Sequence, residues 1–343
     1  MGLDIKDFSF PQDWERYRLA VKRFVETDLE AMSAEVEESN ALPPALMPML
    51  KKSGLLRVRQ PREWGGMGFT LSEFWPIEAE VAKSHGTIRL VVHGHSHKWM
   101  PIYYHGTEAQ KKKYLPILAE GERASFALTE PGTGTGVDIR TTAVKSGDAY
   151  VINGTKHLIT LPNIALFTLV VAYTGDRSLG AKGISFIIVE RDTPGFAVLP
   201  HKDTMGLRGC YHGILHFRDC RVPAENLLGK EGEGLDIALK TFLDPNRVGI
   251  AADCLGACEK MLELAVSQAH TRVTFGKAIG ERQATQQMLA EMATDVYALK
   301  CMIGECARKY DSGEPAAVDA AMCKLFGIEA TRRVSDQALF IHG

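Results

Sequence analysis

The feature that most limits the fold is a long internal segment, residues 124–234, in which the strong signals are those of β-strands. The stretch TTAVKSGDAYVINGTKHLIT predicts strands separated by a Ser-Gly-Asp turn and by Asn153-Gly154, a dipeptide favoured in type I′ hairpins. Further strands are expected in LFTLVVAYT, GISFIIVER and GILHFRDCRV. Because no helix of useful length separates these strands, the segment predicts an antiparallel sheet or barrel and excludes a βαβ unit.

Helical patterns flank this β segment on both sides. Toward the N-terminus, TLSEFWPIEAEVAKSHG starts with Thr70 and Glu73, which have the spacing of a capping box. Beyond Leu235, two apolar stripes at helical spacing indicate a bundle: Leu255, Cys258, Leu262, Ala265 and Ala269, then Leu289, Met292, Val296, Leu299 and Ile303. We therefore predict an α+β protein with an all-α domain at 1–121, a β-barrel domain at 122–235 and a helical bundle at 236–343.

Two prolines mark expected helix boundaries. The helix in GTEAQKKKYLPILAEGE should break near Pro116, because proline removes a hydrogen bond from a helix interior. Asp244-Pro245 matches an N-cap residue followed by proline at the first helical position. The first long helix of the bundle is therefore expected to begin there.

The composition is that of a globular protein without a strong charge bias. The 343 residues carry a formal charge of −2 and are 45% hydrophobic, so neither nucleic acid nor an anionic membrane is an expected partner. No apolar run reaches the roughly 18 residues of a transmembrane helix, and MGLDIKDFSF lacks a secretory signal pattern. The seven cysteines include no CxxC pair, which favours reduced thiols and a cytoplasmic location.

Three histidines alternate with other residues in HGHSH, at His93, His95 and His97. Alternate histidines can share a metal ion when the backbone is extended, but on a helix their side chains diverge. Since the flanking sequence indicates a helix, we expect no metal site in this motif.

A glycine-rich segment, TEPGTGTG, occupies residues 129–136. Glycine allows a backbone to approach a phosphate or a flat ring closely. A Rossmann fingerprint would place its glycines between a strand and the helix it opens, whereas β structure follows here. A phosphate loop would need a lysine followed by serine or threonine, which the segment lacks. Taken alone, the segment predicts only a glycine-rich loop in a barrel.

The surrounding sequence adds a resemblance. TEPGTGTG resembles the TEPGAGSD signature of the acyl-CoA dehydrogenase family. Further segments resemble family elements in the same order: REWGGMGFTLSEF, HGTEAQKKKYLPILAEGE, DAYVINGTKHLIT, VPAENLLGKEGEG, RVTFGKAIGERQATQQMLAEMA and DQALFIHG. Each is weak evidence alone, but together they cover nearly the whole chain and match the helix–β–helix order of the family.

The resemblance implies a helical domain, a β-barrel and a four-helix bundle, with FAD bound without a covalent link. It implies α,β-dehydrogenation of an acyl-CoA thioester, in which a carboxylate removes the α-proton and a hydride passes from Cβ to flavin N5. The thioester carbonyl would be polarised by donors that act as an oxyanion hole. An electron-transfer flavoprotein or similar acceptor and a homodimer or homotetramer are the implied partners.

The resemblance assigns the flavin ring to the backbone of Phe126–Thr135 and to the end of the DAYVINGTKHLIT stretch. Thr129 would bind the pyrimidine edge through its hydroxyl group, and Leu128 through its backbone. Thr160 would approach flavin N5. Leu158 takes the place of a tryptophan, which leaves less ring to cover the flavin.

A second group of residues resembles the part of the family that binds adenosine diphosphate. Arg272, Thr274 and Phe275 match an Arg-x-Thr-Phe motif, and Gln283 matches a glutamine that serves the same site. In the family these residues reach the FAD of a neighbouring subunit. Arginine suits a pyrophosphate because its planar fork binds two oxygens at once.

Three residues are expected on the substrate side. Thr135 stands in place of the family's serine and keeps a hydroxyl group where FAD meets the substrate. Asp244 and Arg247 match the acid and base at the start of the substrate-side helix. An equally good interpretation is that Asp244 caps this helix and Arg247 pairs with it.

The chain also departs from the family pattern. Gly136 replaces an aspartate of the signature, and Phe340 replaces a glutamine that contacts FAD. The catalytic base of most members would lie beyond Gly343, so an incomplete C-terminus is expected and no base is assigned. A minority of members carry the base at the position of Asn246, which cannot accept a proton.

Three functions remain open at this point. The first is an FAD-dependent acyl-CoA dehydrogenase, and the second is an enoyl-CoA reductase on the same fold. The third is a catalytically impaired member that acts as a subunit or interaction partner, which the Leu158 and Phe340 replacements favour. The retained Thr129, Thr160 and Arg272 argue for the first two.

Overall fold

The structure is a computed structural model that describes residues 14–133 and 136–343. Contacts divide the chain into two compact units. The first unit contains the described residues of Met1–Ser33, together with Phe69–His93 and Asp244–Gly343. The second unit contains Ala34–Gly68 and Gly94–Leu243.

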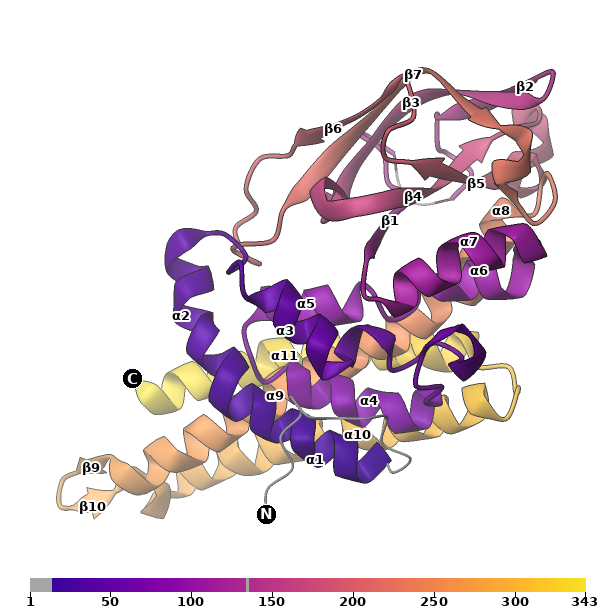
Figure 1. Cartoon of the computed structure of the whole chain (residues 1–343). Coiled ribbons are helices and arrows are strands. Elements are labelled where there is room, and N and C mark those ends of the chain that lie inside the picture. The colour runs from indigo at the N-terminus through magenta and orange to yellow at the C-terminus, as the bar shows by residue number, and fades with distance from the viewer. Residues whose placement is uncertain (1–13, 134–135) are drawn as a thin grey trace. The chain divides into compact units, whose positions relative to one another are not determined.

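The first unit is helical apart from a small ribbon (Figure 1). Its helices are α1 (Trp14–Phe24), a π-helical turn (Val25–Leu29), the start of α2 (Glu30–Ser39), α4 (Leu71–Val81), α5 (Gly86–His93), α9 (Asp244–Thr271), α10 (Gln283–Asp311) and α11 (Ala317–His342). A hairpin of β9 (Val273–Thr274) and β10 (Lys277–Ala278) joins α9 to α10, followed by a short 3₁₀ turn (Ile279–Glu281). Three long helices therefore form most of this unit.

The predicted apolar stripes build the core of the first unit. Leu255 and Cys258 of α9 are 1% exposed, and Met292, Leu299 and Ile303 of α10 are fully buried. These residues pack with apolar side chains of α4 and α11 in two neighbouring clusters. The helical spacing of the sequence is confirmed, because each stripe faces the other helices of the bundle.

Two separate sets of hydrogen bonds hold the start of α4. The predicted capping box is confirmed, since the Thr70 hydroxyl accepts from the Glu73 amide and the Glu73 carboxylate accepts from the Thr70 amide. In addition, the Asp311 carboxylate accepts hydrogen bonds of 2.8 Å from the amides of Leu71 and Ser72. A charge at this end also suits the helix dipole.

The second unit carries an eight-stranded sheet with helices around it (Figure 1). Its helices are α3 (Leu46–Ser53), α6 (Trp99–His105), α7 (Glu108–Ala119) and α8 (Gly234–Ala238), with a π-helical turn at Leu239–Leu243 and 3₁₀ turns at Leu55–Arg57, Arg62–Trp64, Pro162–Ile164, Arg177–Gly183 and Ala224–Asn226. Its strands are β1 (Arg123–Ala127), β2 (Thr142–Ser146), β3 (Ala149–Thr160), β4 (Ala165–Tyr173), β5 (Ile184–Glu190), β6 (Phe196–Pro200), β7 (His212–Pro223) and β8 (Leu227–Leu228).

The strand order corrects the expected barrel. The sheet runs β6-β7-β3-β2-β4-β5-β8, and β1 pairs with β4. Most neighbours are antiparallel as predicted, but β1 and β2 each pair with β4 in parallel. The outer strands are short, and no pairing among the described residues joins β6 to β8, so these strands do not close into a barrel.

The expected hairpin at Asn153-Gly154 is wrong. Strand β3 continues through both residues, and the pairing with β7 shifts register there, as in a β-bulge. Asn153 pairs with Asp219 across the strands, through its side-chain amide and through the Asp219 backbone amide. A Cβ at residue 154 would lie 2.5 Å from the Thr141 hydroxyl oxygen. Glycine is thus required for close approach rather than for a turn.

The break expected at Pro116 is wrong, whereas α9 does begin at Asp244 as predicted, although Asp244 is not its N-cap residue. Helix α7 runs through Pro116 to Ala119 without a break, because Leu115 and Leu118 are buried on either side of the proline and hold the helix. Asp244 directly follows the π-helical turn at Leu239–Leu243, so it is not an N-cap residue. Tertiary packing outweighs the local preference of proline at Pro116.

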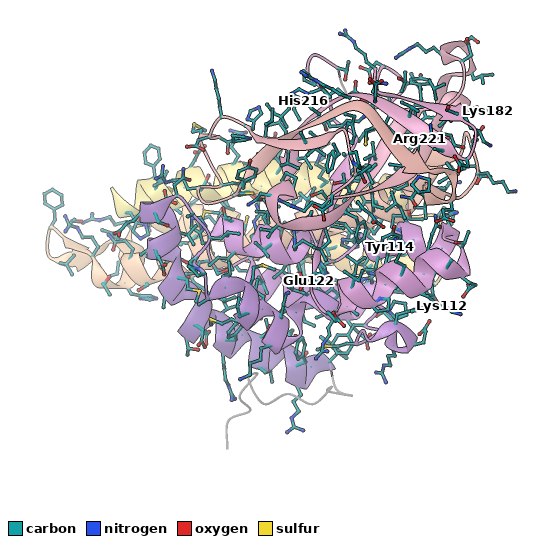
Figure 2. The ribbon with its side chains drawn as sticks, turned by 45° about the horizontal axis from the view of Figure 1, so that its top comes forward. Lys112, Tyr114, Glu122, Lys182, His216 and Arg221 are labelled. Atoms are coloured by element: carbon teal, nitrogen blue, oxygen red, sulfur yellow. The ribbon has the colours of Figure 1, made fainter. Side chains whose placement is uncertain are left out.

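Tyr114 of α7 contacts two strands of the sheet (Figure 2). Its ring centroid lies 4.7 Å from that of Phe167 on β4, and its hydroxyl donates a 2.9 Å hydrogen bond to Glu190 on β5.

Among the helices of the described residues, none combines the length and the apolar character needed to cross a membrane.

Candidate functional site

The glycine-rich segment directly follows β1 and lies beside the end of β3. The Thr129 carbonyl accepts a 3.0 Å hydrogen bond from the amide of His157. Four residues earlier, the Ser125 hydroxyl donates to the Thr160 carbonyl at 3.4 Å. The two segments that were predicted to meet the flavin ring are therefore brought together within the second unit.

A buried ion pair anchors this arrangement. Lys156 of β3 is fully buried and Glu130 is 2% exposed. The Lys156 ammonium donates to the Glu130 carboxylate at 2.7 Å and to the Leu128 carbonyl at 2.9 Å. The same carboxylate accepts from the amides of Arg140 and Thr141, which lie beyond the loop. Glu130 and Lys156 thus connect β3 to the residues before the loop and to the residues after it.

The ionisation of this pair follows from burial and mutual attraction. Burial alone would raise the pKa of Glu130, but the charge and hydrogen bond of Lys156, with the loop amides, hold that pKa below its ordinary value of 4.5. Burial lowers the pKa of Lys156 to about 8 despite the opposing charge of Glu130. Both groups are therefore charged at neutral pH. The sequence held no signal for this pair, whose members are 26 residues apart.

The loop itself suits a flat, polar ligand. Gly132 and Gly136 have φ angles of 72° and 140°, and a Cβ built on either meets no atom within 4 Å. The Thr133 hydroxyl oxygen is buried and has no hydrogen-bond partner among the described residues. Thr135 lies outside the described residues. The loop therefore combines a backbone that a ligand can approach closely with a buried hydroxyl group that is free to bond to it.

The other residues predicted for the ring have different environments. Leu128 is buried, and Phe126 stacks on Phe242 with a ring-centroid distance of 4.3 Å, so the Phe126 side chain serves packing. Leu158 is 43% exposed and has a φ of 55° at an irregularity of β3. A left-handed leucine is strained, and such strain is concentrated at functional sites. Thr160 is half-buried at the end of the strand.

The residues predicted for adenosine diphosphate lie on or beside the β9–β10 hairpin of the first unit. Phe275 is 98% exposed at its tip. Thr274 accepts hydrogen bonds from Arg282 through its carbonyl and its hydroxyl, which stiffens the hairpin. Arg272 and Gln283 are exposed, and their side chains have no partner among the described residues. The hairpin therefore presents a cation, an amide and an aromatic ring to solvent.

Asp244 and Arg247 form an ion pair at the start of α9. Burial raises the pKa of Asp244 and the Arg247 charge opposes this shift. The expected pairing of Arg247 with Asp244 is therefore present. The expected N-cap role of Asp244 is not. Asn246 lies between them in the sequence and is half-buried.

Two of the HGHSH histidines, His93 and His95, have different partners. His93 ends α5, and its Nδ1 lies 2.9 Å from a carboxylate oxygen of Glu78. His95 instead contacts the Leu118 carbonyl through Nε2 at 2.9 Å. The partner of His93 is distant in sequence, so the motif gave no sign of it.

Comparisons with known proteins decide the family. Models of the N-terminal, middle and C-terminal domains of acyl-CoA dehydrogenases match residues 11–122, 125–220 and 232–343. The chain belongs to the acyl-CoA dehydrogenase family. Members of this family are FAD-dependent oxidoreductases that act on acyl-CoA thioesters.

Individual relatives agree with this family. The chain is 37% identical over 341 residues to acryloyl-CoA reductase (NADH) of Anaerotignum propionicum, covering 98% of this chain and 86% of the relative. It is 34% identical to a short-chain specific acyl-CoA dehydrogenase of Clostridium acetobutylicum, covering 98% and 89%. The structure of butyryl-CoA dehydrogenase from Megasphaera elsdenii matches with a TM-score of 0.92 and 34% identity, covering 98% and 89%.

Proposed function

We propose that this protein oxidises an acyl-CoA thioester between its α and β carbons, with FAD held by the loop after β1 and the end of β3. The observation that carries the proposal is the placement of Thr129 beside His157 and of Thr160 beside Ser125. These contacts bring two hydroxyl-bearing segments together at the C-terminal end of β3. The ion pair of Glu130 with Lys156 keeps the loop in place.

Each group has a distinct role in this proposal. FAD, when bound, supplies the acceptor for the hydride that leaves Cβ. Thr129 and the backbone at Leu128 would hold the pyrimidine edge of the flavin, and Thr160 would lie on the side of the reacting nitrogen. The Asp244–Arg247 pair fixes the start of α9 on the substrate side. Asn246 occupies a position from which a carboxylate could take the α-proton, but its amide cannot do so.

The reverse reaction is the second candidate. The similarity to acryloyl-CoA reductase (NADH) favours it, since that relative is named for reduction. The same residues would serve both directions, because a catalyst accelerates forward and reverse steps alike. An electron-transfer flavoprotein or a similar carrier would exchange electrons with the bound FAD in either case.

A spectral test separates the candidates. The test uses the Asn246→Glu variant, because the amide of Asn246 cannot accept the α-proton. The yellow variant mixed with butyryl-CoA without oxygen should lose its flavin absorption if it is a dehydrogenase with a suitable substrate. Protein first reduced with dithionite should regain this absorption with an enoyl-CoA if it works as a reductase. Comparing the rates of the two half-reactions shows which direction the site favours. Colourless protein that takes up no added FAD would contradict both candidates.

An assembly of at least two chains is part of the proposal. The outer face of α11 exposes several large apolar side chains: Val318, Met322, Leu325, Leu339 and Phe340. Extended apolar faces of this kind mark interfaces between proteins. Phe275 is also fully exposed at the hairpin tip. We expect a homodimer or homotetramer in which the hairpin of one chain completes the FAD site of another.

Replacing Arg272 with alanine tests this arrangement. The variant removes a charge-assisted contact to the pyrophosphate worth about 1.5–3 kcal/mol. FAD affinity, measured by quenching of flavin fluorescence, should fall about tenfold or more. Lys277→Ala is the matched control, because Lys277 is an exposed cation on the same hairpin that has no assigned contact. Equal losses for both variants, or monomers with full FAD affinity, would rule the arrangement out.

A further inference from the structure

A pocket of about 300 Å³ lies in the first unit, where four of its helices meet. Trp14 and Arg18 of α1 and Trp75 and Glu80 of α4 line this pocket, together with side chains of α9 and α10. Every lining residue belongs to the first unit. A pocket of this volume would hold about ten water molecules and reaches the lower limit for small-molecule sites. It is therefore large enough for a small organic ligand.

The close crossing of α4 and α9 forms the inner end of the pocket. A Cβ on residue 256 would lie 2.0 Å from the Ala79 carbonyl oxygen, so Gly256 is needed for the two helices to approach this closely. Ala79 and Leu255 are 4% and 1% exposed, and both line the pocket. Because Ala79 contributes only a methyl group, space remains beside it. The half-buried indole rings of Trp14 and Trp75 line the same space.

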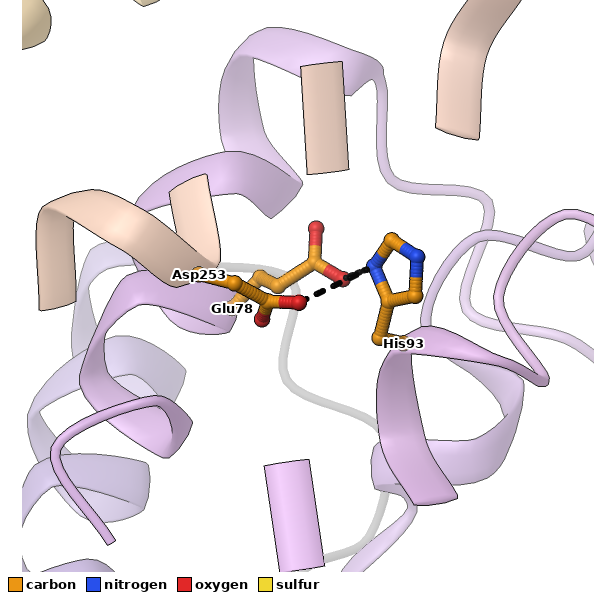
Figure 3. A group of neighbouring side chains, drawn as sticks. All are labelled: Glu78, His93 and Asp253. Atoms are coloured by element: carbon orange, nitrogen blue, oxygen red, sulfur yellow. Dashed lines mark hydrogen bonds and ion pairs between the residues drawn. The ribbon is translucent and has the colours of Figure 1, made fainter. Parts of the chain in front are cut away.

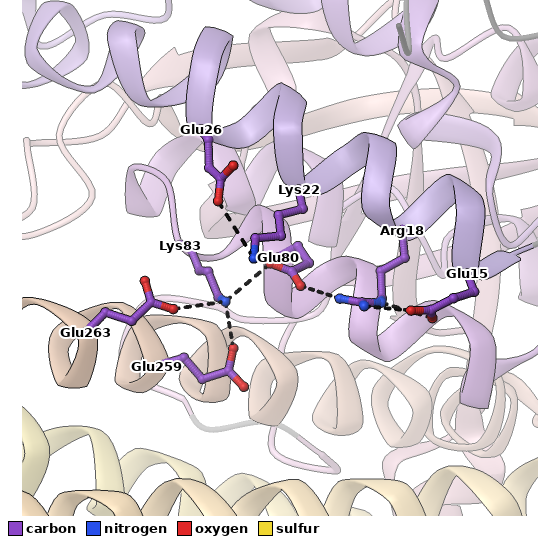
Figure 4. A network of polar contacts seen from close by, with 8 residues as sticks. All are labelled: Glu15, Arg18, Lys22, Glu26, Glu80, Lys83, Glu259 and Glu263. Carbon is purple, nitrogen blue, oxygen red and sulfur yellow. Dashed lines mark hydrogen bonds and ion pairs between the residues drawn. The ribbon is translucent and has the colours of Figure 1, made fainter. Parts of the chain in front are cut away.

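The two carboxylates of the lining are paired with protein cations (Figure 4). Oε1 of Glu80 accepts a 2.5 Å hydrogen bond from Arg18. Oε2 of Glu80 accepts no hydrogen bond among the described residues, but the Lys83 ammonium lies 3.3 Å from it and 2.9 Å from the Glu259 carboxylate. Burial alone would lower the pKa of Lys83, but Glu259 and the neighbouring carboxylates raise it above its ordinary value. Lys83 is therefore charged and balances these carboxylates.

Three groups of the lining have no protein partner among the described residues, and all three are hydrogen-bond donors. They are the indole N–H groups of Trp14 and Trp75 and the ammonium group of Lys300 on α10. Glu15 and Glu263 also touch the charged network, but their side chains are 46% and 61% exposed, so solvent screens their charges. The unpaired charge of the lining is thus positive.

Another buried polar cluster of this unit is separate from the pocket (Figure 3). Glu78 of α4, His93 of α5 and Asp253 of α9 are 1%, 4% and 2% exposed, and none of them lines the pocket. The Nδ1 atom of His93 lies 2.9 Å from Glu78 and 3.4 Å from Asp253. Glu78 and Glu80 are two residues apart on α4, so their side chains leave the helix on different faces. The carboxylates of this cluster therefore add no charge to the lining.

We propose that the pocket binds a small organic acid, with a carboxylate on a flat apolar body such as an arylalkanoate. The carboxylate accepts hydrogen bonds from the Lys300 ammonium and from an indole N–H group, which have no other acceptor. The apolar body packs against the indole rings and against Leu255 and Ala79, where an aromatic ring buries a large area. A cationic ligand would instead compete with Arg18 and Lys83 for carboxylates that are already paired.

Three free ligands that share one body and differ in their polar group test the proposal. 3-Phenylpropanoate is compared with 3-phenylpropanamide and with 3-phenylpropylammonium by calorimetric titration of the flavin-loaded protein. The carboxylate should bind about tenfold more tightly than the amide, because hydrogen bonds between charged groups are stronger than those of a neutral group. The ammonium ligand should bind most weakly of the three.

Variants connect this preference to the pocket. Lys300→Met removes the ammonium group and should weaken carboxylate binding about threefold to fivefold, as expected for an exposed ion pair, while amide binding is unchanged. Trp75→Phe keeps an aromatic ring, loses the indole N–H group and should also weaken binding. Lys277→Met is the matched control, because Lys277 is an exposed lysine of the same unit that does not line the pocket. Circular dichroism checks that each variant is folded.

Each contrary result overturns the inference. Equal binding of the three ligands, or binding of none, would show that the pocket does not select an organic acid. Tighter binding of the ammonium ligand would show that Glu80 and Glu259 control the site. Carboxylate binding that is identical in Lys300→Met and in the unaltered protein would place the ligand elsewhere. All these results leave the proposed function unaffected, because no residue of the pocket has a role in it.

Discussion

Replacing Lys156 with methionine should lower the free energy of unfolding by about 3–5 kcal/mol, because it leaves the Glu130 carboxylate buried without its counter-charge. The side chains of this pair are 0% and 3% exposed, so water cannot compensate for the lost ammonium. The variant also loses the hydrogen bond to the Leu128 carbonyl. Denaturant unfolding followed by circular dichroism measures the effect, and the loop after β1 should become more accessible to protease.

The control is the exposed ion pair of Arg221 on β7 with Asp148 in the turn between β2 and β3. Arg221 is labelled in Figure 2. Their side chains are 54% and 96% exposed, so Arg221→Ala should cost less than about 1 kcal/mol. The double variant Glu130→Gln with Lys156→Met should recover part of the loss, since it removes the unpaired charge. If Lys156→Met unfolds no more easily than Arg221→Ala, the pair does not anchor the loop.

The free energy of unfolding at acidic pH gives a second test of this ion pair. The pKa of Glu130 is lower in the folded protein than its ordinary value of 4.5. Its contribution to stability is therefore present above pH 4.5 and is lost as the pH falls through the lower folded value. The Lys156→Met variant should show a weaker dependence in this range, because the shift depends on the Lys156 charge.

The sequence predicted those parts of the fold that depend on local patterns. The stripe through Leu255 and Cys258 is buried as expected, and the capping box at Thr70 is present. The barrel and the hairpin at Asn153-Gly154 were not predicted correctly, because strand pairing depends on partners far along the chain. Gly154, for example, is needed where Thr141 crosses close to it. No local signal distinguishes that role from a turn.

The same distinction applies to the candidate site. Thr129 and Thr160 are proposed through motif resemblance, since each lies in a short recognisable segment. The pair of Glu130 with Lys156 could not be predicted, because the contact exists only once β3 lies beside the loop. The cluster of Glu78, His93 and Asp253 is even harder to predict from sequence, because its residues come from three different helices. HGHSH drew attention to His93, but the motif did not predict its contacts with Glu78 and Asp253.

The largest effect is expected at Asn246. The 343-residue chain should not exchange the α-proton of an acyl-CoA with deuterated solvent at a measurable rate, because the amide of Asn246 cannot accept a proton. Asn246→Glu places a carboxylate on the half-buried face of α9, next to Arg247. Partial burial should raise the pKa of that carboxylate and make it a better base. A positioned base contributes about 10²–10⁴-fold, so exchange followed by proton NMR should become readily detectable.

Asn246→Gln completes the test, because it has the length of glutamate without its basicity. Exchange should stay absent in this variant, which separates proton transfer from a change in shape. Exchange catalysed by the unaltered chain would show that another carboxylate already acts as the base. Exchange that is equal in the glutamate and glutamine variants would mean that position 246 does not face the α-carbon. Either result would move the search to the other acidic groups along α9, beginning with Asp244, whose pKa is already raised by burial.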